Sequence, residues 1–453
     1  MVSASPTARL DAWRQAHRER LQRCAPVQIM GRIAGVNGIL LHSHMPQARI
    51  GDLCEIRRAD GSEVMAEIVG FDRQHTLLAA LGALDGIAIG APVRPLFQPH
   101  SLVVGDHLLG AVLDGFGRAL SADGPSAFAL AGAVGAQPVI RDAPPATERP
   151  RIETALSTGL RAIDGLLTLG EGQRVGLFAG AGCGKTTLLA EMARNTPCET
   201  IVFGLIGERG RELREFLDHE LDEQLRARTV LVCATSDRSS MERARAAFTA
   251  TTIAEGFRQQ GKSTLLIIDS LTRFARAQRE IGLASGEPAG RGGLPPSVYS
   301  LLPRLVERAG RTRTGAITAL YSVLIEQDSM NDPVADEVRS LLDGHIVLSR
   351  RLAERGHYPA VDILTSLSRT MSNVVGTEQL KAATQIRRLL AAYQQVEMLI
   401  KLGEYQQGND PLTDFAVHSR EQVMDFLQQS LRDPVSLDDT LDHLIQVTAD
   451  VPR

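Results

Sequence analysis

Short apolar runs alternate with helical patterns through the middle of the chain, from about residue 151 to 375. Six of these runs have the length and the apolar character of buried strands. They are Arg174–Ala179, Thr200–Leu205, Thr229–Ala234, Ser263–Asp269, Ile317–Leu324 and His345–Leu348. This alternation predicts an α/β fold, in which helices cover both faces of a mostly parallel sheet.

Residues 26–95 have a different pattern, because their apolar runs are shorter and turn signals separate them. The turn signals include Asn37-Gly38, Gly51-Asp52 and Asp60-Gly61. Short strands at this spacing predict a small β-barrel or a sandwich. A barrel that binds oligonucleotides needs aromatic stacking platforms, and Phe71 is the only aromatic residue of the segment. We therefore interpret the barrel as structural or oligomer-forming.

Both ends of the chain have helical patterns. In residues 7–24, one helical face carries Leu10, Trp13, His17, Leu21 and Cys24. This amphipathic helix either packs on its own domain or docks on a partner or an anionic membrane surface, and the sequence leaves both readings open. From about residue 376 onward, stretches such as LKAATQIRRLLAAYQQVEMLIKLGEY predict further helices.

The composition excludes several classes of protein. Of 453 residues, 43% are hydrophobic and 23% are charged, which argues against wholesale disorder. The net charge of −4 argues against a general binder of polyanions. No apolar run approaches the length of a membrane-spanning helix, and the start of the chain lacks the apolar core of a secretory leader. The five scattered cysteines form no CxxC pair, so they favour a reducing cytoplasm and argue against a disulfide framework or a zinc site.

The strongest motif is the glycine-rich turn in RVGLFAGAGCGKTTLLAEMA, between a predicted strand and a predicted helix. Glycines let consecutive backbone N–H groups point at phosphate oxygens, and the helix N-terminus adds partial positive charge. Lys185 is expected to reach the β- and γ-phosphates of ATP, Thr186 to ligate Mg²⁺, and Thr187 to contact the α-phosphate. The other nucleotide-binding residues of this phosphate loop are Gly180, Ala181, Gly182, Cys183 and Gly184.

The phosphate loop departs from the usual GxxxxGK[ST] pattern at one position. Ala179 stands where the first glycine is expected. Alanine is tolerated at that strand end provided that its φ stays negative. The dinucleotide fingerprint GxGxxG fails, because its third glycine position is Lys185. Cys183 is interpreted as a packing residue without a catalytic task.

Two carboxylates follow predicted strands. Asp269 ends an apolar run and is expected to hold Mg²⁺ directly or through water. Glu208 follows the strand at Thr200–Leu205, at the edge of the sheet where ligands bind in open α/β folds. It is a candidate to orient the attacking water. A surface ion pair with Arg211 or Arg214 is the alternative, and the residues alone do not decide between the two.

Long motifs, in order along roughly residues 26–430, resemble the ATPases that energise type III protein secretion. The motifs are LFAGAGCGKTT, GLIGERGRE, ATSDRSSMERARAAFTATTIAE, IIDSLTRFARAQREIGLASGEPAGRGGLPPSVYSLLPRLVERAG, NDPVADEVRSLLDGHIVLSR and ERGHYPAVDILTSLSR. That family includes the injectisome and flagellar export ATPases, and both are similar to the catalytic subunit of rotary ATP synthases. The sequence looks closest to injectisome members from plant-associated bacteria, and alanine at position 179 is common in this branch.

The resemblance implies a RecA-like P-loop ATPase core with a small N-terminal β-barrel and a C-terminal helical domain. The expected segments are an N-terminal amphipathic helix (1–25), the barrel (26–95), a connector (96–150), the P-loop ATPase domain (151–375) and the helical domain (376–453).

The resemblance also implies roles for single residues. Glu208 matches the catalytic glutamate, and Arg209 matches the arginine beside it. Arg273 matches an arginine near the γ-phosphate. Arg369 matches the arginine finger that reaches the nucleotide of a neighbouring subunit, and Tyr358 matches an aromatic residue that stacks on adenine. From the pattern alone, Arg369 would be a salt-bridged surface residue and Tyr358 a core aromatic residue.

The implied function is a cytoplasmic, Mg²⁺-dependent ATP hydrolase, peripheral at the inner-membrane secretion apparatus. It would act as a homohexamer with sites between subunits, and hydrolysis would drive chaperone release and unfolding of export substrates. The expected partners are a stator-type regulator, a central stalk protein, the export gate and chaperone–effector complexes, without nucleic acid.

Three alternatives compete with this hypothesis. A ring-forming RNA- or DNA-dependent ATPase motor is opposed by the net negative charge and the single aromatic residue of the barrel. A nucleotide-binding assembly subunit without turnover is opposed by Glu208. A rotary synthase subunit is disfavoured by Ala179 and by the GRGGLPPSV stretch.

Overall fold

The computed structural model describes residues 10, 13–15, 17–18, 30–122, 124–129, 133–325, 332–408 and 410–452. The chain divides into two units, Met1–Pro99 and His100–Arg453. Most of the amphipathic helix expected over residues 7–24, including Cys24, lies outside the described residues; Leu10, Trp13 and His17 are helical and exposed. Within the described part of the chain, no helix combines the length and the apolar character needed to cross a bilayer.

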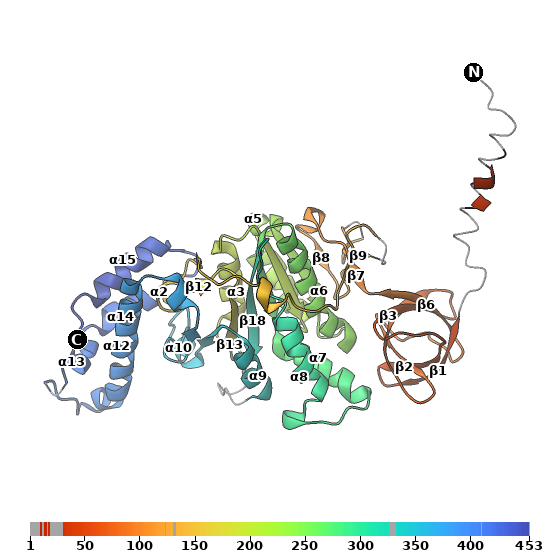
Figure 1. Ribbon diagram of the computed structural model, residues 1–453. Coiled ribbons are helices and arrows are strands. Elements are labelled where there is room, and N and C mark those ends of the chain that lie inside the picture. The colour runs from red at the N-terminus through yellow and green to blue at the C-terminus, as the bar shows by residue number, and fades with distance from the viewer. Residues whose placement is uncertain are drawn as a thin grey trace, which may run out of the picture. The chain divides into compact units, whose positions relative to one another are not determined.

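The first unit contains a closed antiparallel barrel, drawn in red and orange in Figure 1. Its strands are β1 (Gly31–Asn37), β2 (Leu40–His44), β3 (Asp52–Arg57), β4 (Glu63–Phe71), β5 (Thr76–Ala80) and β6 (Pro92–Pro99). They are hydrogen-bonded in the order β1-β2-β5-β4-β3-β6. Inward-facing side chains such as Leu41, Ile56 and Leu78 are fully buried and fill the interior. Of the two folds that the sequence predicts for this segment, the barrel is therefore the one present.

In the segment expected as a connector, residues 96–150, the first residues belong to β6 of the barrel and the rest carries short strands of its own. β7 (Ser101–Leu102), β9 (Phe128–Ala129) and β10 (Gln137–Pro138) form a three-stranded sheet. β8 (Val112–Leu113) pairs in parallel with β15 (Thr229–Ala234) and so adds a strand to the edge of the large sheet. Strands of two residues are too short for a hydrophobic period to develop, and the sequence pattern therefore resembles a loop.

A nine-stranded, mostly parallel sheet forms the centre of the second unit. Its parallel strands are β8, β15, β13 (Arg174–Ala179), β14 (Thr200–Ile206), β16 (Ser263–Asp269), β18 (Ala316–Leu324) and β19 (Gly344–Leu348). The antiparallel strands are β17 (Gly310–Arg311) and β20 (Leu367–Ser368), and β11 (Ala155–Leu156) pairs with β12 (Leu169–Gly170) apart from this sheet. All residues of β14 and β15 are buried, as expected of parallel strands covered on both faces. The α/β prediction is confirmed.

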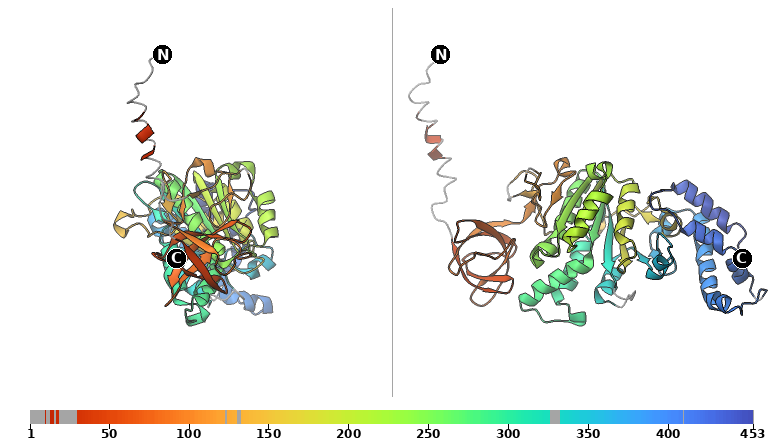
Figure 2. Two further views of the ribbon diagram at one scale, coloured as in Figure 1. Left: turned by 90° about the vertical axis from the view of Figure 1, so that its right-hand side faces the viewer. Right: turned by 180° about the vertical axis from the view of Figure 1, so that it is seen from behind.

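Helices lie on both faces of this sheet, and Figures 1 and 2 show α3 and α6 on opposite sides of it. The helices up to residue 374 are α2 (Arg161–Leu166), α3 (Lys185–Asn195), α4 (Gly210–Glu215), α5 (Glu223–Ala227), α6 (Ser240–Gln259), α7 (Leu271–Ala284), α8 (Pro296–Val306), α9 (Pro333–Leu341), α10 (Arg350–Glu354) and α11 (Met371–Val374). Ser239 and Ser270 cap α6 and α7 by accepting hydrogen bonds from backbone N–H groups of the first turn.

The chain beyond residue 376 is helical, as predicted. Its helices are α12 (Thr377–Leu402), α13 (Pro411–His418), α14 (Arg420–Leu427) and α15 (Leu437–Thr448). They pack on α2: Gln379 of α12 donates to the carbonyl oxygens of Asp164 at 2.9 Å and Gly165 at 3.3 Å. Phe426 of α14 is fully buried. The helical segment thus shares one hydrophobic core with the start of the ATPase-like sheet.

A buried ionic cluster ties helix α6 to the chain around residue 139. We call Arg308, Glu255 and Arg258 the Arg308 cluster. Arg308 is fully buried, and its guanidinium donates to Glu255, to the Val139 carbonyl at 2.8 Å and to the Thr252 hydroxyl at 2.8 Å. Arg258 donates to the carbonyl oxygen of Arg308 at 2.9 Å. Each of these cations therefore has carboxylate and neutral acceptors around it.

Candidate active site

The phosphate loop lies between β13 and α3. Gly182 and Gly184 have positive φ values of 80° and 76°, which side chains with a Cβ rarely adopt. Ala179 is the last residue of β13, is fully buried, and is not among the described non-glycine residues with positive φ. The condition for tolerating alanine at that position is therefore met. Cys183 is buried within the loop.

The side chain of Lys185, the first residue of α3, points to two carboxylates. Its Nζ forms an ion pair with Asp269 and lies 3.9 Å from Oε1 of Glu208. Asp269 ends β16, two strands away from β13, and it is only 3% exposed. Its Oδ1 also accepts a hydrogen bond from the hydroxyl of Ser322 at 2.5 Å. The structure thus brings together the lysine and the aspartate that the sequence assigned to phosphate and metal.

Glu208 lies just beyond the end of β14 and completes a cluster with Arg273. The distance between Nη2 of Arg273 and Oε2 of Glu208 is 3.1 Å. We call Lys185, Glu208, Asp269 and Arg273 the Lys185 cluster. The expected alternative, an ion pair of Glu208 with Arg211 or Arg214, is absent among the described residues, because Arg211 and Arg214 pair with Glu215 and Asp218.

The environment of Glu208 favours its protonated form. Its pKa is raised to about 7, chiefly because burial disfavours the charged carboxylate. A hydrogen bond with Glu212 and the negative charge of Asp269 act in the same direction. Arg209, by contrast, has a side chain that is 79% exposed and pairs with Glu212 at 3.7 Å. Arg209 is therefore adjacent to the cluster without joining it.

A cleft of about 390 Å³ opens beside the cluster. Its polar lining consists of Thr186, Thr187, Glu208, Glu212, Glu215, His219, Glu220 and Asp269. Hydroxyl and carboxylate oxygens are the ligands that Mg²⁺ prefers, and Thr186 and Asp269 contribute such oxygens to the same wall. The residues present therefore fit the predicted magnesium ion.

Tyr358 lies against the phosphate loop. A Cβ atom built on Gly184 would be 3.6 Å from Cε1 of the Tyr358 ring. The tyrosine is 41% exposed, so it is not the core residue that the pattern alone suggested. Its carbonyl accepts a hydrogen bond from the backbone N–H of Gln429 at 3.0 Å, which links it to the end of α14. A partly exposed aromatic ring beside the loop is suited to stacking on a base.

Arg369 lies at the opposite end of the strands from the phosphate loop. Its backbone N–H donates to the carbonyl of Asp343 at 3.0 Å, and Asp343 donates to the carbonyl of Arg174, the first residue of β13, at 2.9 Å. The loop begins after Ala179, about five residues farther along β13, or roughly 17 Å at about 3.3 Å per residue. An arginine side chain is much shorter than that. Within the described ranges, the exposed side chain of Arg369 has no hydrogen bond or ion pair.

Sequence reasoning did not identify two residues of the site. Ser322 of β18 reaches Asp269 because β16 and β18 are neighbours, with Ile268 opposite Tyr321. Glu212 follows Glu208 by one helical turn and shares a hydrogen bond with it. The i, i+4 spacing of Glu212 was a visible signal, whereas nothing in the sequence indicated which strand would lie beside β16.

The fold and the cleft define a P-loop nucleoside triphosphatase with a preceding β-barrel and following helices. The family models agree in three segments: the ATP synthase alpha/beta family nucleotide-binding domain at residues 159–368, its beta-barrel domain at 33–96, and the T3SS EscN ATPase C-terminal domain at 375–446.

Individual relatives narrow the class. A type 3 secretion system ATPase of Pseudomonas syringae pv. syringae is 66% identical and spans 98% of this chain and 100% of its own length. The SPI-2 type 3 secretion system ATPase of Salmonella typhimurium is 51% identical over 88% of this chain and 90% of its own. The structure of the assembled ATPase EscN from enteropathogenic E. coli matches with a TM-score of 0.86 and 46% identity, covering 92% of this chain and 99% of that one.

The chain belongs to the type 3 secretion system ATPases. It is an ATP hydrolase of type III protein secretion, and the recognition made from the motifs is confirmed. The alternative of a nucleic-acid-dependent motor has no support among these relatives.

Proposed function

We propose that the chain hydrolyses MgATP in sites that are shared between adjacent copies of a homohexameric ring. The observation that carries this proposal is the position of Arg369, roughly 17 Å along the strands from its own phosphate loop. It is exposed and has no partner in the described part of its own chain. The nucleotide that Arg369 contacts would therefore be bound by a neighbouring copy of the chain. The solved structure of EscN is that of an assembled ATPase, which supports this arrangement.

Each residue of the Lys185 cluster has a task that fits its position. Phosphoryl transfer spreads negative charge over the γ-phosphate oxygens, so cations fixed in advance lower the barrier. Lys185 exchanges its carboxylate partner for phosphate oxygens, and Arg273 holds Glu208 toward the cleft. In its ionised form, Glu208 orients the attacking water and accepts its proton. Tyr358 stacks on the adenine, with Gly180 to Thr187 around the phosphates.

A magnesium ion held by Thr186 and Asp269 would neutralise part of the charge on the β- and γ-phosphates. Ser322 supports this role, because its hydroxyl fixes one oxygen of Asp269 and leaves the other carboxylate oxygen for the cleft.

The finer biological assignments are also proposals. We infer that hydrolysis drives chaperone release and unfolding of export substrates at the cytoplasmic side of the inner-membrane secretion apparatus. EscN has been solved in complex with its central stalk EscO, which supports a central stalk protein as a partner. A stator-type regulator, the export gate and chaperone–effector complexes rest on the family resemblance.

Mixing two inactive variants tests the shared site. Lys185→Ala lacks the phosphate lysine and Arg369→Ala lacks the finger, so each alone should show almost no hydrolysis. In a mixed ring, an intact Lys185 of one copy meets an intact Arg369 of the next copy. The ATPase rate of an equimolar mixture should therefore rise well above the sum of the two variants.

The control is Arg388→Ala, an exposed arginine on α12, which should hydrolyse ATP at the normal rate alone and in mixtures. Failure of the mixture to recover activity, with both variants assembled, would place the finger in the same chain as the lysine. Full activity of Arg369→Ala alone would remove Arg369 from the reaction altogether.

A further inference from the structure

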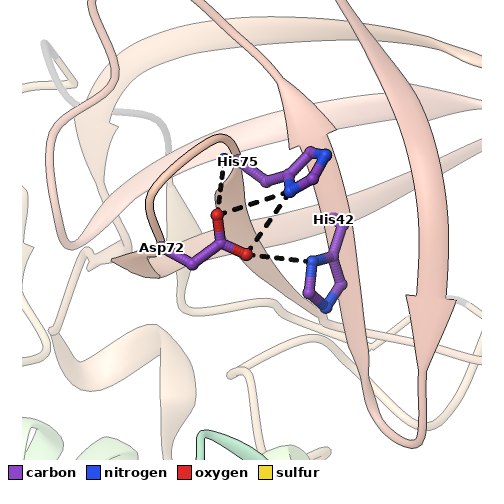
Figure 3. A group of neighbouring side chains, drawn as sticks. All are labelled: His42, Asp72 and His75. Atoms are coloured by element: carbon purple, nitrogen blue, oxygen red, sulfur yellow. Dashed lines mark hydrogen bonds and ion pairs between the residues drawn. The ribbon is translucent and has the colours of Figure 1, made fainter.

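Two histidines and an aspartate meet on the outer surface of the barrel. We call His42, Asp72 and His75 the His42 cluster, and Figure 3 shows the two imidazole rings turned toward the carboxylate. His42 is on β2, whose neighbouring residues Leu41 and Ser43 face the barrel interior and are buried. Asp72 and His75 lie in the turn that joins β4 to β5. None of the three belongs to the nucleotide cleft.

The distances in the cluster are those of metal ligands. Nδ1 of His42 lies 3.3 Å from Oδ2 of Asp72, and Nδ1 of His75 lies 3.4 Å from the same oxygen. Ligand atoms at about 2.0–2.1 Å from a tetrahedral zinc ion are separated by roughly 3.4 Å. The two ring centroids are 5.4 Å apart, close to the roughly 5 Å expected for two imidazoles bound through nitrogen to one such ion.

The carboxylate is held in place before any ligand arrives. Oδ1 of Asp72 accepts hydrogen bonds from the backbone N–H groups of Gln74 at 2.8 Å and His75 at 2.6 Å. Hydrogen bonds of this kind orient metal-binding carboxylates and strengthen binding. Oδ2 faces the imidazole of His42 at 3.3 Å, and Nδ1 of His75 lies 3.3 Å from Oδ1 and 3.4 Å from Oδ2. The ring of His44, on the same face of β2 as His42, lies 4.7 Å from the ring of His75 and provides a further imidazole within reach.

We propose that His42, Asp72 and His75 bind one divalent transition-metal ion, zinc in the first instance, through the two Nδ1 atoms and Oδ2 of Asp72. Imidazole nitrogen with a carboxylate oxygen is a donor set that suits zinc. The fourth position is taken by water or by His44. Because the ligands come from β2 and from the β4–β5 turn, the ion cross-links two parts of the barrel and stabilises it. The five cysteines form no CxxC pair, which argued against a zinc site. Histidine and carboxylate ligands were not considered in that expectation, and the proposed site departs from it.

A titration of the full-length chain tests the site. The protein is treated with a chelator, desalted and titrated with Zn²⁺ by calorimetry without nucleotide, and separately with Co²⁺ followed by visible absorption. One saturable zinc site per chain is expected, and bound Co²⁺ should show d–d bands without a thiolate charge-transfer band. Zinc should also raise the midpoint of thermal unfolding.

Substitutions assign the ligands. His42→Ala, His75→Ala and Asp72→Asn should each weaken zinc binding at least about tenfold. Asp72→Asn keeps the Oδ1 acceptor of the turn, so its barrel should fold normally, and unchanged ATP hydrolysis in Mg²⁺ checks this. His418→Ala, an exposed histidine on α13, should bind zinc as the unaltered chain does. Absence of saturable binding, a zinc affinity of Asp72→Asn and His42→Ala equal to that of the unaltered chain, or a thiolate band with Co²⁺ would each overturn the proposal.

Discussion

The Arg308 cluster and the Lys185 cluster both bury charged groups beside the same sheet, but their surroundings differ. Arg308 is fully enclosed and donates to a carboxylate, a carbonyl and a hydroxyl. Lys185 has only carboxylates as partners, and its cluster borders a cleft of about 390 Å³. The charged groups of the Arg308 cluster are enclosed by partners from the same chain, whereas those of the Lys185 cluster face a cleft that can admit a ligand.

This difference teaches that buried charge alone does not mark a reactive site. A buried cation with enough acceptors rigidifies the fold. A cation that shares carboxylates beside a cleft retains the capacity to bind an anion. The raised pKa of Glu208 is a second sign, because perturbed groups in clefts are candidates for function. Substitutions in the Lys185 cluster should therefore mainly reduce hydrolysis, whereas substitutions in the Arg308 cluster should mainly reduce stability.

The largest effect is expected for Lys185→Ala. Loss of the phosphate lysine should reduce the rate of ATP hydrolysis at least about 10³-fold, because a preplaced cation is missing in the transition state. The chain should still fold, with a smaller loss of stability than Arg308→Met, because the cleft gives water access to the carboxylates that remain. Lys381→Ala, at an exposed position of α12, is the matched control. Normal turnover in Lys185→Ala would show that the Lys185 cluster, like the Arg308 cluster, has no catalytic role.

The second largest fall in the rate of hydrolysis is expected for Glu208→Gln. The amide keeps the size of the side chain but cannot accept a proton from water, so steady-state hydrolysis should fall by about 10²–10⁴-fold. Binding of a fluorescent ATP analogue should be retained. A variant that hydrolyses ATP normally would move the task of orienting water to another residue of the cleft, with Glu212 the nearest candidate.

Arg308→Met should reduce stability and leave hydrolysis nearly unchanged, the reverse of what is expected for Lys185→Ala. Removing Arg308 takes away one of the three cations around Glu255, together with its hydrogen bonds to the Val139 carbonyl and the Thr252 hydroxyl, and the expected loss of stability is about 3 kcal/mol. Chemical denaturation measures this loss, while hydrolysis per folded chain at low temperature should stay near normal. Unchanged stability would mean that Glu255 is adequately satisfied by Arg141 and Arg258, which also approach it.

The smallest effect is a pH dependence that only the Lys185 cluster should produce. In the folded chain without nucleotide the pKa of Glu208 is about 7, whereas in the unfolded chain it returns to its ordinary value of 4.5. The contribution of Glu208 to stability is therefore highest at low pH and is lost as the pH rises from about 4.5 to about 7.

Thermal unfolding midpoints of the unaltered chain and Glu208→Gln, compared between pH 5 and pH 8, measure this slope. The unaltered chain should lose stability relative to the variant as the pH rises. Glu212 does not obscure the comparison, because the hydrogen bond with Glu208 lowers the pKa of Glu212 below this range. A pH-independent difference would show that Glu208 is ionised throughout.

The sequence predicted those parts of the molecule that local chemistry determines. β13 and β16 begin and end where the apolar runs do, because parallel strands buried on both faces leave no polar position inside the run. Lys185 was identified from the glycine-rich motif, Asp269 from its place at the end of an apolar run, and Glu208 from its place after a strand together with the family resemblance. The parts that depend on register between distant strands were not predictable: the pairing of β8 with β15, the contact of Ser322 with Asp269, and the distance of Arg369 from its own loop.

The closure of the barrel has a consequence for how the protein behaves when many copies crowd together. An open sheet presents unpaired backbone groups that recruit strands from other molecules and start aggregates. In the barrel formed by β1 to β6, β1 pairs with both β2 and β6, so the ring of hydrogen bonds has no loose end. Folded copies can therefore lie side by side at high concentration without their barrel strands pairing with one another.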